Sequence, residues 1–251
     1  MSITAAITVT ARGSADDYVS YSGIASALNT HQFVYGEKDV LVDRAGQAFE
    51  RVVLYTCRNG APFARKTVSY VDRWAPNFVL EDASTGLLEG LRQEYGGRAV
   101  YFRAAAGLAE RSAALPNIPG LVVDAGFDEF VRANWQRLTT GQSLTMHFLI
   151  PSRLSDMPFR IEQLRADHID GEPVDVFRLR LGGVFGRFLT GIDVYYGVQD
   201  HLLVRYVGLS DLRDAGGNNY EVDVTFDPKD RKPSAPSAVE SALQARLAPC
   251  A

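Results

Sequence analysis

The sequence predicts an α+β protein that is mainly antiparallel β. We expect one strongly curved sheet, or an incomplete β-barrel, with one helix at about residues 126–138 packed on its concave face. Apolar and polar residues alternate over 219–226, as in a half-buried antiparallel strand. Similar short stretches recur at near-regular spacing over 143–226 and are separated by turn residues, which is typical of a β-meander. Residues 126–138 carry the one clear helical periodicity.

The second half of the chain predicts six strands. They are 143–150, 159–166, 174–181, 191–196, 201–208 and 219–226, with connections that are rich in Gly, Pro and Asp. Within 159–166, Phe159 and Ile161 share one face, but Leu164 falls on the other. A β-bulge explains this change of phase, and bulges bend a sheet toward closure.

The first half is less regular. The strands expected there are 31–35, 39–42, 48–57, 63–71, 77–82 and 98–103, while 16–28 and 87–95 fit a strand or a helix equally well. Asn59-Gly60 predicts a hairpin turn between 48–57 and 63–71. The alanine-rich segment 104–114 predicts a short helix.

The expected helix at 126–138 has an apolar stripe, a start signal and a stop signal. The stripe consists of Phe127, Phe130, Val131, Trp135 and Leu138 at spacings of three and four. Asp124 precedes it as the expected N-cap, and Gly141 follows it as a stop. A helix with such a stripe must bury it, and the concave face of the sheet is the nearest apolar surface.

Composition limits the possible function classes. The chain has 251 residues, of which 46% are hydrophobic, and a formal net charge of −4. These values fit a β-rich domain over 1–228, with 229–251 as a linker and a short C-terminal helix or tail. Scattered basic residues and a pI near 5.6 argue against a nucleic-acid partner. The sequence contains no run of about 20 apolar residues, so it predicts no transmembrane segment. It leaves the oligomeric state open.

The two cysteines and the N-terminus bear on the compartment. Cys57 lies in an expected strand and Cys250 in an expected mobile tail, so the sequence favours two unpaired thiols over a disulfide. Residues 2–11 are weakly apolar and lack the basic start of a secretory signal. We expect a periplasmic bacterial protein whose signal has been removed, or a cytoplasmic one if Met1 is the native start.

No motif predicts catalysis, a metal or a cofactor. The four histidines lack ligand spacing, Cys57 has no recognisable partner, and no serine lies in a nucleophile elbow. Oxygen-bearing residues surround Gly216-Gly217, but turn formation explains them better than calcium binding. They are Asp211, Asp214, Asn218 and Asn219.

Charged residues on consecutive strands form the most informative set. Arg178, Arg180, Asp193, Arg205, Glu221 and Asp223 alternate in sign from strand to strand. A solvated sheet face with cross-strand ion pairs is the simpler interpretation. The functional alternative places Arg178, Arg180 or Arg205 at a cavity, where a guanidinium binds an anionic head group.

Aromatic residues complete the expected ligand site. Phe185, Tyr196 and Tyr206 fall in or near the last strands, and Trp135 lies on the helix. We expect them to line a cavity between sheet and helix, although they would equally fill a core.

A curved sheet roofed by a helix resembles, in architecture only, the unclosed barrels of bacterial lipoprotein carriers and related envelope proteins. The first hypothesis is therefore a non-enzymatic binding protein for an apolar or amphipathic, lipid-like ligand. The alternatives are an enzyme on the same scaffold, such as a hydrolase or isomerase, and a structural or assembly factor.

Overall fold

The computed structural model describes residues 16–182 and 191–250. Its strands are β1 (Asp17–Ala27), β2 (Phe33–Arg44), β3 (Gln47–Thr56), β4 (Pro62–Ser69), β5 (Asn77–Asp82), β6 (Leu88–Glu94), β7 (Gly97–Arg103), β8 (Arg111–Leu115), β9 (Leu121–Val122), β10 (Leu144–Ile150), β11 (Ser155–Ile169), β12 (Glu172–Leu181), β13 (Ile192–Gly197), β14 (Leu203–Arg213), β15 (Asn219–Phe226) and β16 (Lys232–Pro233). Its helices are α1 (Gly126–Ala133), α2 (Trp135–Thr139) and α3 (Ser237–Gln244), with short 3-10 turns at Pro151–Arg153 and Pro228–Asp230.

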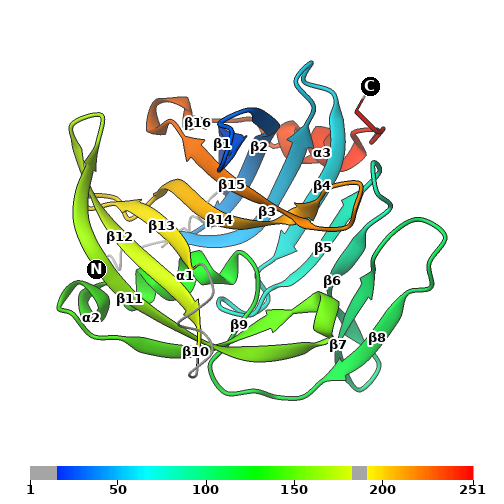
Figure 1. Cartoon of the computed structure of the whole chain (residues 1–251), viewed down its shortest axis with the longest axis horizontal. Coiled ribbons are helices and arrows are strands. Elements are labelled where there is room, and N and C mark those ends of the chain that lie inside the picture. Colours follow the sequence, from blue (N-terminus) through cyan, green and yellow to red (C-terminus); the bar gives the residue numbers. More distant parts are fainter. Residues whose placement is uncertain (1–15, 183–190, 251) are drawn as a thin grey trace, which may run out of the picture.

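All the strands belong to one curved, unclosed sheet. Its order is β8-β7-β6-β5-β4-β3-β2-β1-β15-β14-β13-β12-β11-β10-β9, with β16 beside β1. Two meanders therefore meet where β1 pairs with β15, and the sheet ends at β8 and β9 (Figure 1). The β9–β10 pairing is parallel and the others are antiparallel. The expected curved, mainly antiparallel sheet is confirmed, and it is larger than the sequence indicated.

The predicted bulge is present at the expected place. The register between β11 and β12 shifts between Gln163 and Arg165, so Leu164 is the extra residue. Register shifts also occur in the β1–β2, β2–β3 and β13–β14 pairs. Such irregularities increase local bending, which lets the sheet wrap around an interior.

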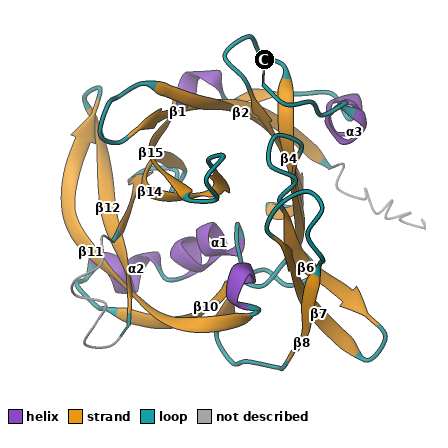
Figure 2. Cartoon of the chain, turned by 45° about the vertical axis from the view of Figure 1, so that its right-hand side comes forward, coloured by secondary structure: helices purple, strands orange, loops and turns teal. Residues whose placement is uncertain are grey.

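The predicted helix at 126–138 is two shorter helices inside the curve (Figure 2). The break lies at Asn134, whose side-chain amide donates to the Phe130 carbonyl at 2.9 Å. Asparagine side chains compete for backbone groups in this way and so favour helix ends. The apolar stripe is buried as expected, because Phe130, Val131 and Leu138 pack against Phe177 and Val194 of the concave face.

Two other expectations are corrected, and two segments that the sequence left open are strands. Residues 104–114 form no helix, because the chain turns at Gly107 and then enters β8. The stretches 31–35 and 39–42 form one strand, β2, that runs through Gly36. Residues 16–28 and 87–95, left open by their patterns, form the strands β1 and β6.

Cys57 and Cys250 form a disulfide, so the expectation of two unpaired thiols is wrong. The C-terminal segment is held in place rather than mobile. Val239 and Ala242 of α3 pack on Val40 and Val52 of the outer sheet face, and the tail then returns to the end of β3.

Candidate functional site: an interior cavity

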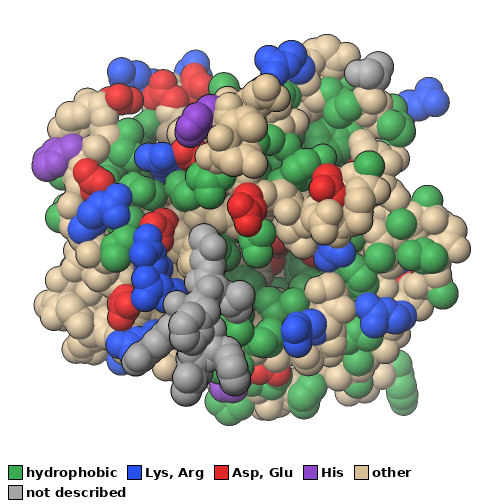
Figure 3. Space-filling model, in the orientation of Figure 1, with side chains coloured by type: hydrophobic (Ala, Val, Ile, Leu, Met, Phe, Trp, Pro, Cys, Tyr) green, Lys and Arg blue, Asp and Glu red, His purple; other side chains and the backbone are tan. Residues whose placement is uncertain are grey.

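A cavity of about 670 Å³ lies inside the curved sheet. Figure 3, drawn in the orientation of Figure 1, shows a surface that is hollowed near its middle, with hydrophobic side chains around the hollow. The volume falls within the range of sites that hold small molecules. Residues from both meanders and from the start of α1 line it.

One wall of the cavity is apolar. It is contributed by β10 to β14, whose inward residues alternate with outward ones along each strand. The wall consists of Phe148, Met157, Phe159, Leu179, Leu181, Ile192, Val194 and Leu203. The same strands also pack against α1 and α2, so these helices close one side of the cavity.

The opposite wall carries charged residues on β2, β4 and β6. Glu37 is on β2, Lys66 on β4 and Glu89 on β6, and all three line the cavity. Each occupies an inward position between residues that are themselves buried: Lys66 lies between Ala64 and Val68, and Glu89 between Leu87 and Leu91. Because side chains alternate along a strand, these charges point inward.

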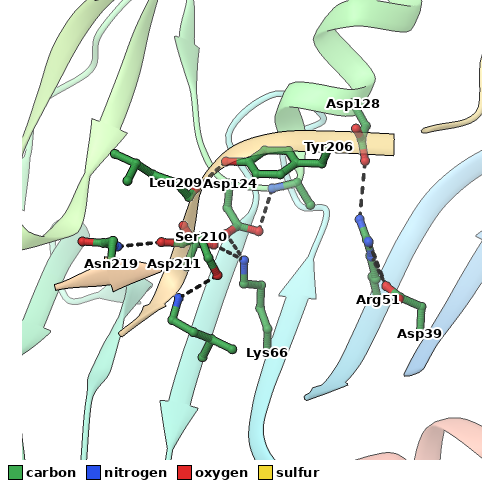
Figure 4. Close-up of polar contacts among 12 residues, drawn as sticks. Asp39, Arg51, Lys66, Asp124, Asp128, Tyr206, Leu209, Ser210, Asp211 and Asn219 are labelled. Atoms are coloured by element: carbon green, nitrogen blue, oxygen red, sulfur yellow. Dashed lines mark hydrogen bonds and ion pairs between the residues drawn. The ribbon is translucent and has the colours of Figure 1, made fainter. Parts of the chain in front are cut away.

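Lys66 is held between two carboxylates (Figure 4). Its Nζ lies 2.6 Å from Asp124 Oδ2 and 2.5 Å from Asp211 Oδ2. Burial opposes the ammonium form, but the attraction of Asp124 and Asp211 outweighs it and raises the pKa of Lys66 well above its usual range. Lys66 therefore remains an ammonium and is not available as a nucleophile.

Asp124 is not the N-cap that the sequence predicted. The position before α1 is occupied by Ala125, which makes no side-chain cap bond. Asp124 instead adopts a positive φ of 44°, and its Oδ1 accepts the Ala125 N–H at 2.6 Å. This conformation leaves Oδ2 free to contact Lys66, so the residue joins the loop before α1 to β4.

A second charged group anchors α1 to the sheet. Arg51 of β3 donates to Asp39 Oδ1 at 2.8 Å and lies 3.4 Å from Asp128 of α1. The Tyr196 hydroxyl donates to the other oxygen of Asp128 at 2.6 Å. These bonds connect β2, β3, α1 and β13 across the interior. A smaller cavity of about 230 Å³ adjoins this group and shares Arg51 and Asp128 with the large one.

Glu37 and Glu89 differ from Lys66, Asp124, Asp211, Arg51 and Asp128, which are all in ion pairs. Among residues 16–182 and 191–250, neither carboxyl has a hydrogen bond or ion pair, and Glu89 is only 5% exposed. Burial, with nearby acidic groups adding to it, raises the pKa of each to about 8. Two carboxyls without a partner in the described chain therefore face the cavity.

The three predicted arginines lie on the outer face. Arg178 pairs with Asp193 and Arg205 with Asp223, and Arg180 shares the face of Arg178. Their inward neighbours, Leu179, Leu181 and Tyr206, line the cavity instead. The cross-strand ion pairs that the sequence favoured are thus present, and these guanidinium groups point away from the interior.

The predicted aromatic residues are divided. Tyr206 lines the cavity. Tyr196 is fully buried beside Phe177, and Trp135 packs edge-on against both of these rings and stacks on His201. Phe185 lies outside the described residues.

The sequence interpretation missed Glu37, Lys66 and Glu89, and it gave Asp124 a capping role instead of a place in the cavity wall. The signal that finds Lys66 and Glu89 is a charged residue in phase with buried apolar neighbours two positions away, as in Leu87-x-Glu89-x-Leu91. Asp211, considered with the turn around Gly216, instead contacts Lys66.

Residues 16–182 and 191–250 contain neither a metal-binding cluster nor a membrane-spanning helix. No group of three or more His, Cys, Asp or Glu side chains in that part of the chain is placed to hold a metal ion. None of its helices is long and apolar enough to cross a membrane.

The fold is similar to that of a solved bacterial protein. A beta-barrel-like protein from Brucella abortus, of the domain of unknown function DUF1849, superposes with a TM-score of 0.51. The match covers 87% of this chain and 98% of that one at 7% sequence identity. Neither a protein-family model nor a curated protein matches the sequence. The likeness therefore establishes a barrel-like fold.

Proposed function

We propose that this protein is a non-enzymatic binding protein that holds an apolar or amphipathic, lipid-like molecule between its curved sheet and its helices. The observation that carries the proposal is the cavity of about 670 Å³ with one continuous apolar wall. An apolar surface of this kind is stabilised when a ligand displaces water from it. The charged wall opposite suits a molecule with one polar end.

The arrangement of reactive groups favours binding over catalysis. Lys66 is held as an ammonium by Asp124 and Asp211. The close pair formed by His147 and Asp156, 2.6 Å apart, involves the side of β10 opposite Met146 and Phe148, and neither residue lines the cavity. An acid–base pair outside the cavity has no access to a molecule bound within it.

We propose the bacterial envelope, and its periplasm, as the compartment. The Cys57–Cys250 disulfide supports this because such bonds persist in oxidising compartments. The bacterial origin of the protein with a similar fold is in keeping with it.

Fluorescence of the neutral apolar probe N-phenyl-1-naphthylamine tests the proposal. We expect saturable binding, with fluorescence enhanced by transfer of the probe into the cavity. Leu203→Trp places a larger side chain at the apolar wall and so fills part of the cavity. It should weaken binding by about tenfold or more, corresponding to roughly 1.4 kcal/mol. The matched control is Leu164→Trp at the exposed bulge of β11, which should leave binding unchanged.

Equal effects of the two substitutions, or an absence of saturable binding, would contradict the proposal. Native mass spectrometry of protein purified from its own host is the complementary measurement. We expect an additional mass of a lipid-like molecule, which organic solvent should extract.

A further inference from the structure

We propose that the polar end of the ligand is cationic, an ammonium group that Glu37 and Glu89 receive within the cavity. The inference rests on the proposed function and adds to it the charge of the ligand. It follows from which charged groups already have partners in the described chain and which do not.

The two carboxyls flank a lysine that is already paired. The cross-strand register places Lys66 opposite Leu80, and Leu80 opposite Glu89, in one row along the inner face. Glu89 is thus two strands from Lys66, or roughly 10 Å at the usual strand spacing. Asp124 and Asp211 occupy the Lys66 ammonium, so it has little capacity left to neutralise Glu89 or Glu37.

Acidic groups outnumber basic ones around the whole cavity. The lining includes the acids Glu37, Glu89, Asp124, Asp128, Asp211 and Glu221, and the bases Arg51, Lys66, Arg153 and Arg213. Arg51 is paired with Asp39 and Asp128. Arg213 stacks over the Phe102 ring at 4.8 Å and makes no ion pair with Glu89 in the described chain. Among the described residues, the unpaired acids Glu37, Glu89 and Glu221 outnumber the unpaired bases Arg153 and Arg213. When the acids are ionised, a bound cation balances their charge, whereas a carboxylate or phosphate would add to it.

Aromatic rings accompany Glu37. Tyr35, Tyr55 and Tyr206 line the cavity with it, and the first two rings meet edge to face at 5.5 Å between centroids. Tyrosine faces attract ammonium groups, including quaternary ones, most strongly where water is excluded. Carboxyl groups beside such rings suit an alkylammonium head on an apolar body.

The protonation of these carboxyls gives the inference a distinct signature. The ionisation of Glu37 is opposed or favoured by the charges around it. These groups are Asp39, Arg51, Lys66 and Asp211, together with the hydroxyls of Tyr35, Tyr55 and Tyr206. The groups that act in the same way on the ionisation of Glu89 are Lys66, Tyr101, Asp124, Asp211 and Arg213. With a pKa of about 8, each is mainly protonated at pH 7 in the empty cavity. A cation that favours the ionised forms must release protons as it binds.

Competition by dodecyl compounds against N-phenyl-1-naphthylamine tests the inference. The compounds are dodecyltrimethylammonium, dodecanoate and the neutral dodecyl maltoside, each used below its micelle-forming concentration. We expect dodecyltrimethylammonium to displace the probe at a concentration about tenfold or more below that of dodecanoate. Because its charge is permanent, its affinity should increase from pH 6 to pH 9 as the two carboxyls ionise. Calorimetry in buffers of different ionisation enthalpy should show proton release.

Substitution of the two acids separates their role from general hydrophobic binding. Glu37→Gln/Glu89→Gln should abolish the preference for the cation and the proton release, while dodecyl maltoside binding persists. Glu162→Gln, at an exposed outer ion pair, is the matched control and should change neither. Thermal unfolding shows whether the double variant is folded. The two single variants are measured in the same way.

Different failures have different meanings. Equal or stronger binding of dodecanoate, or a cation preference that survives the double substitution, would overturn the inference and leave the proposed function standing. If neither the probe nor any dodecyl compound binds, the proposed function falls, and this inference falls with it.

Discussion

The outer face of β12 to β15 and the inner face of β2 to β6 differ in whether their charged side chains have ion-pair partners. On the outer face, Arg178 of β12 pairs with Asp193 of β13 directly across from it, and Arg205 of β14 pairs with Asp223 of β15. On the inner face, Lys66 has two carboxylate partners, but Glu37 and Glu89 have none among the described residues. Arg178 and Arg205 of the outer face are thus matched by acids of the chain itself. The unmatched inner acids mark the place where a partner from outside the chain is expected.

The largest expected effect comes from removing the inner cation. Lys66→Met leaves Asp124 without its partner at a position where its side chain is only 8% exposed. We expect the free energy of unfolding to fall by about 3–5 kcal/mol, as when one member of a buried ion pair is removed. Urea unfolding measures this loss.

Asp211→Asn is the internal control for the Lys66 substitution. It should cost much less, because the Asp211 side chain is 49% exposed and Lys66 keeps Asp124. Similar costs for Lys66→Met and Asp211→Asn would show that the depth of burial does not govern this cluster.

An intermediate effect is expected from pH. The pKa of Glu37 and of Glu89 is about 8 in the folded protein, against 4.5 for an ordinary glutamate. The folded state then binds more protons than the unfolded state between these values, so stability falls as pH rises from about 5 to 8.5. We expect the free energy of unfolding of the ligand-free protein to fall across this range, and urea unfolding at a series of pH values measures it.

The Glu37→Gln/Glu89→Gln variant should flatten that pH profile, because glutamine does not titrate. If the variant and the unsubstituted protein lose stability in parallel, other groups are responsible, and the contrast between the two faces is weakened.

The smallest effect is expected on the outer face. Arg178→Met removes a guanidinium that is 28% exposed and paired near solvent. Exposed pairs contribute little, so we expect a change of less than about 1 kcal/mol in the free energy of unfolding and no change in probe binding. A loss comparable to that of Lys66→Met would remove the distinction between inner and outer charges.

Alternation along strands predicted much of the fold and the outer ion pairs. The pattern over 219–226 gave the bounds of β15, and the phase change at Leu164 located the bulge of β11. Both are local properties of the chain. The division of the helix at Asn134 and the strand at Arg111–Leu115 were not predicted, because hydrogen bonding and pairing with β7 override helical propensity there.

The cavity was harder to predict for a different reason. Lys66 on β4, Asp124 before α1 and Asp211 on β14 are far apart in sequence, and only the curvature of the sheet brings them together. The same curvature decides which face of β12 is concave, and hence that Leu179, rather than Arg178, lines the interior. Curvature depends on the sum of many small twists and bulges, which no single stretch of sequence reveals.

The bond between Cys57 and Cys250 spans 193 residues and makes most of the chain a covalent ring. A single proteolytic cut at any loop between these cysteines would leave the two fragments joined. Such a nicked molecule should migrate as one species on a denaturing gel until a reductant separates the fragments. The ring includes β4 to β15, so both walls of the cavity would stay tethered after a cut.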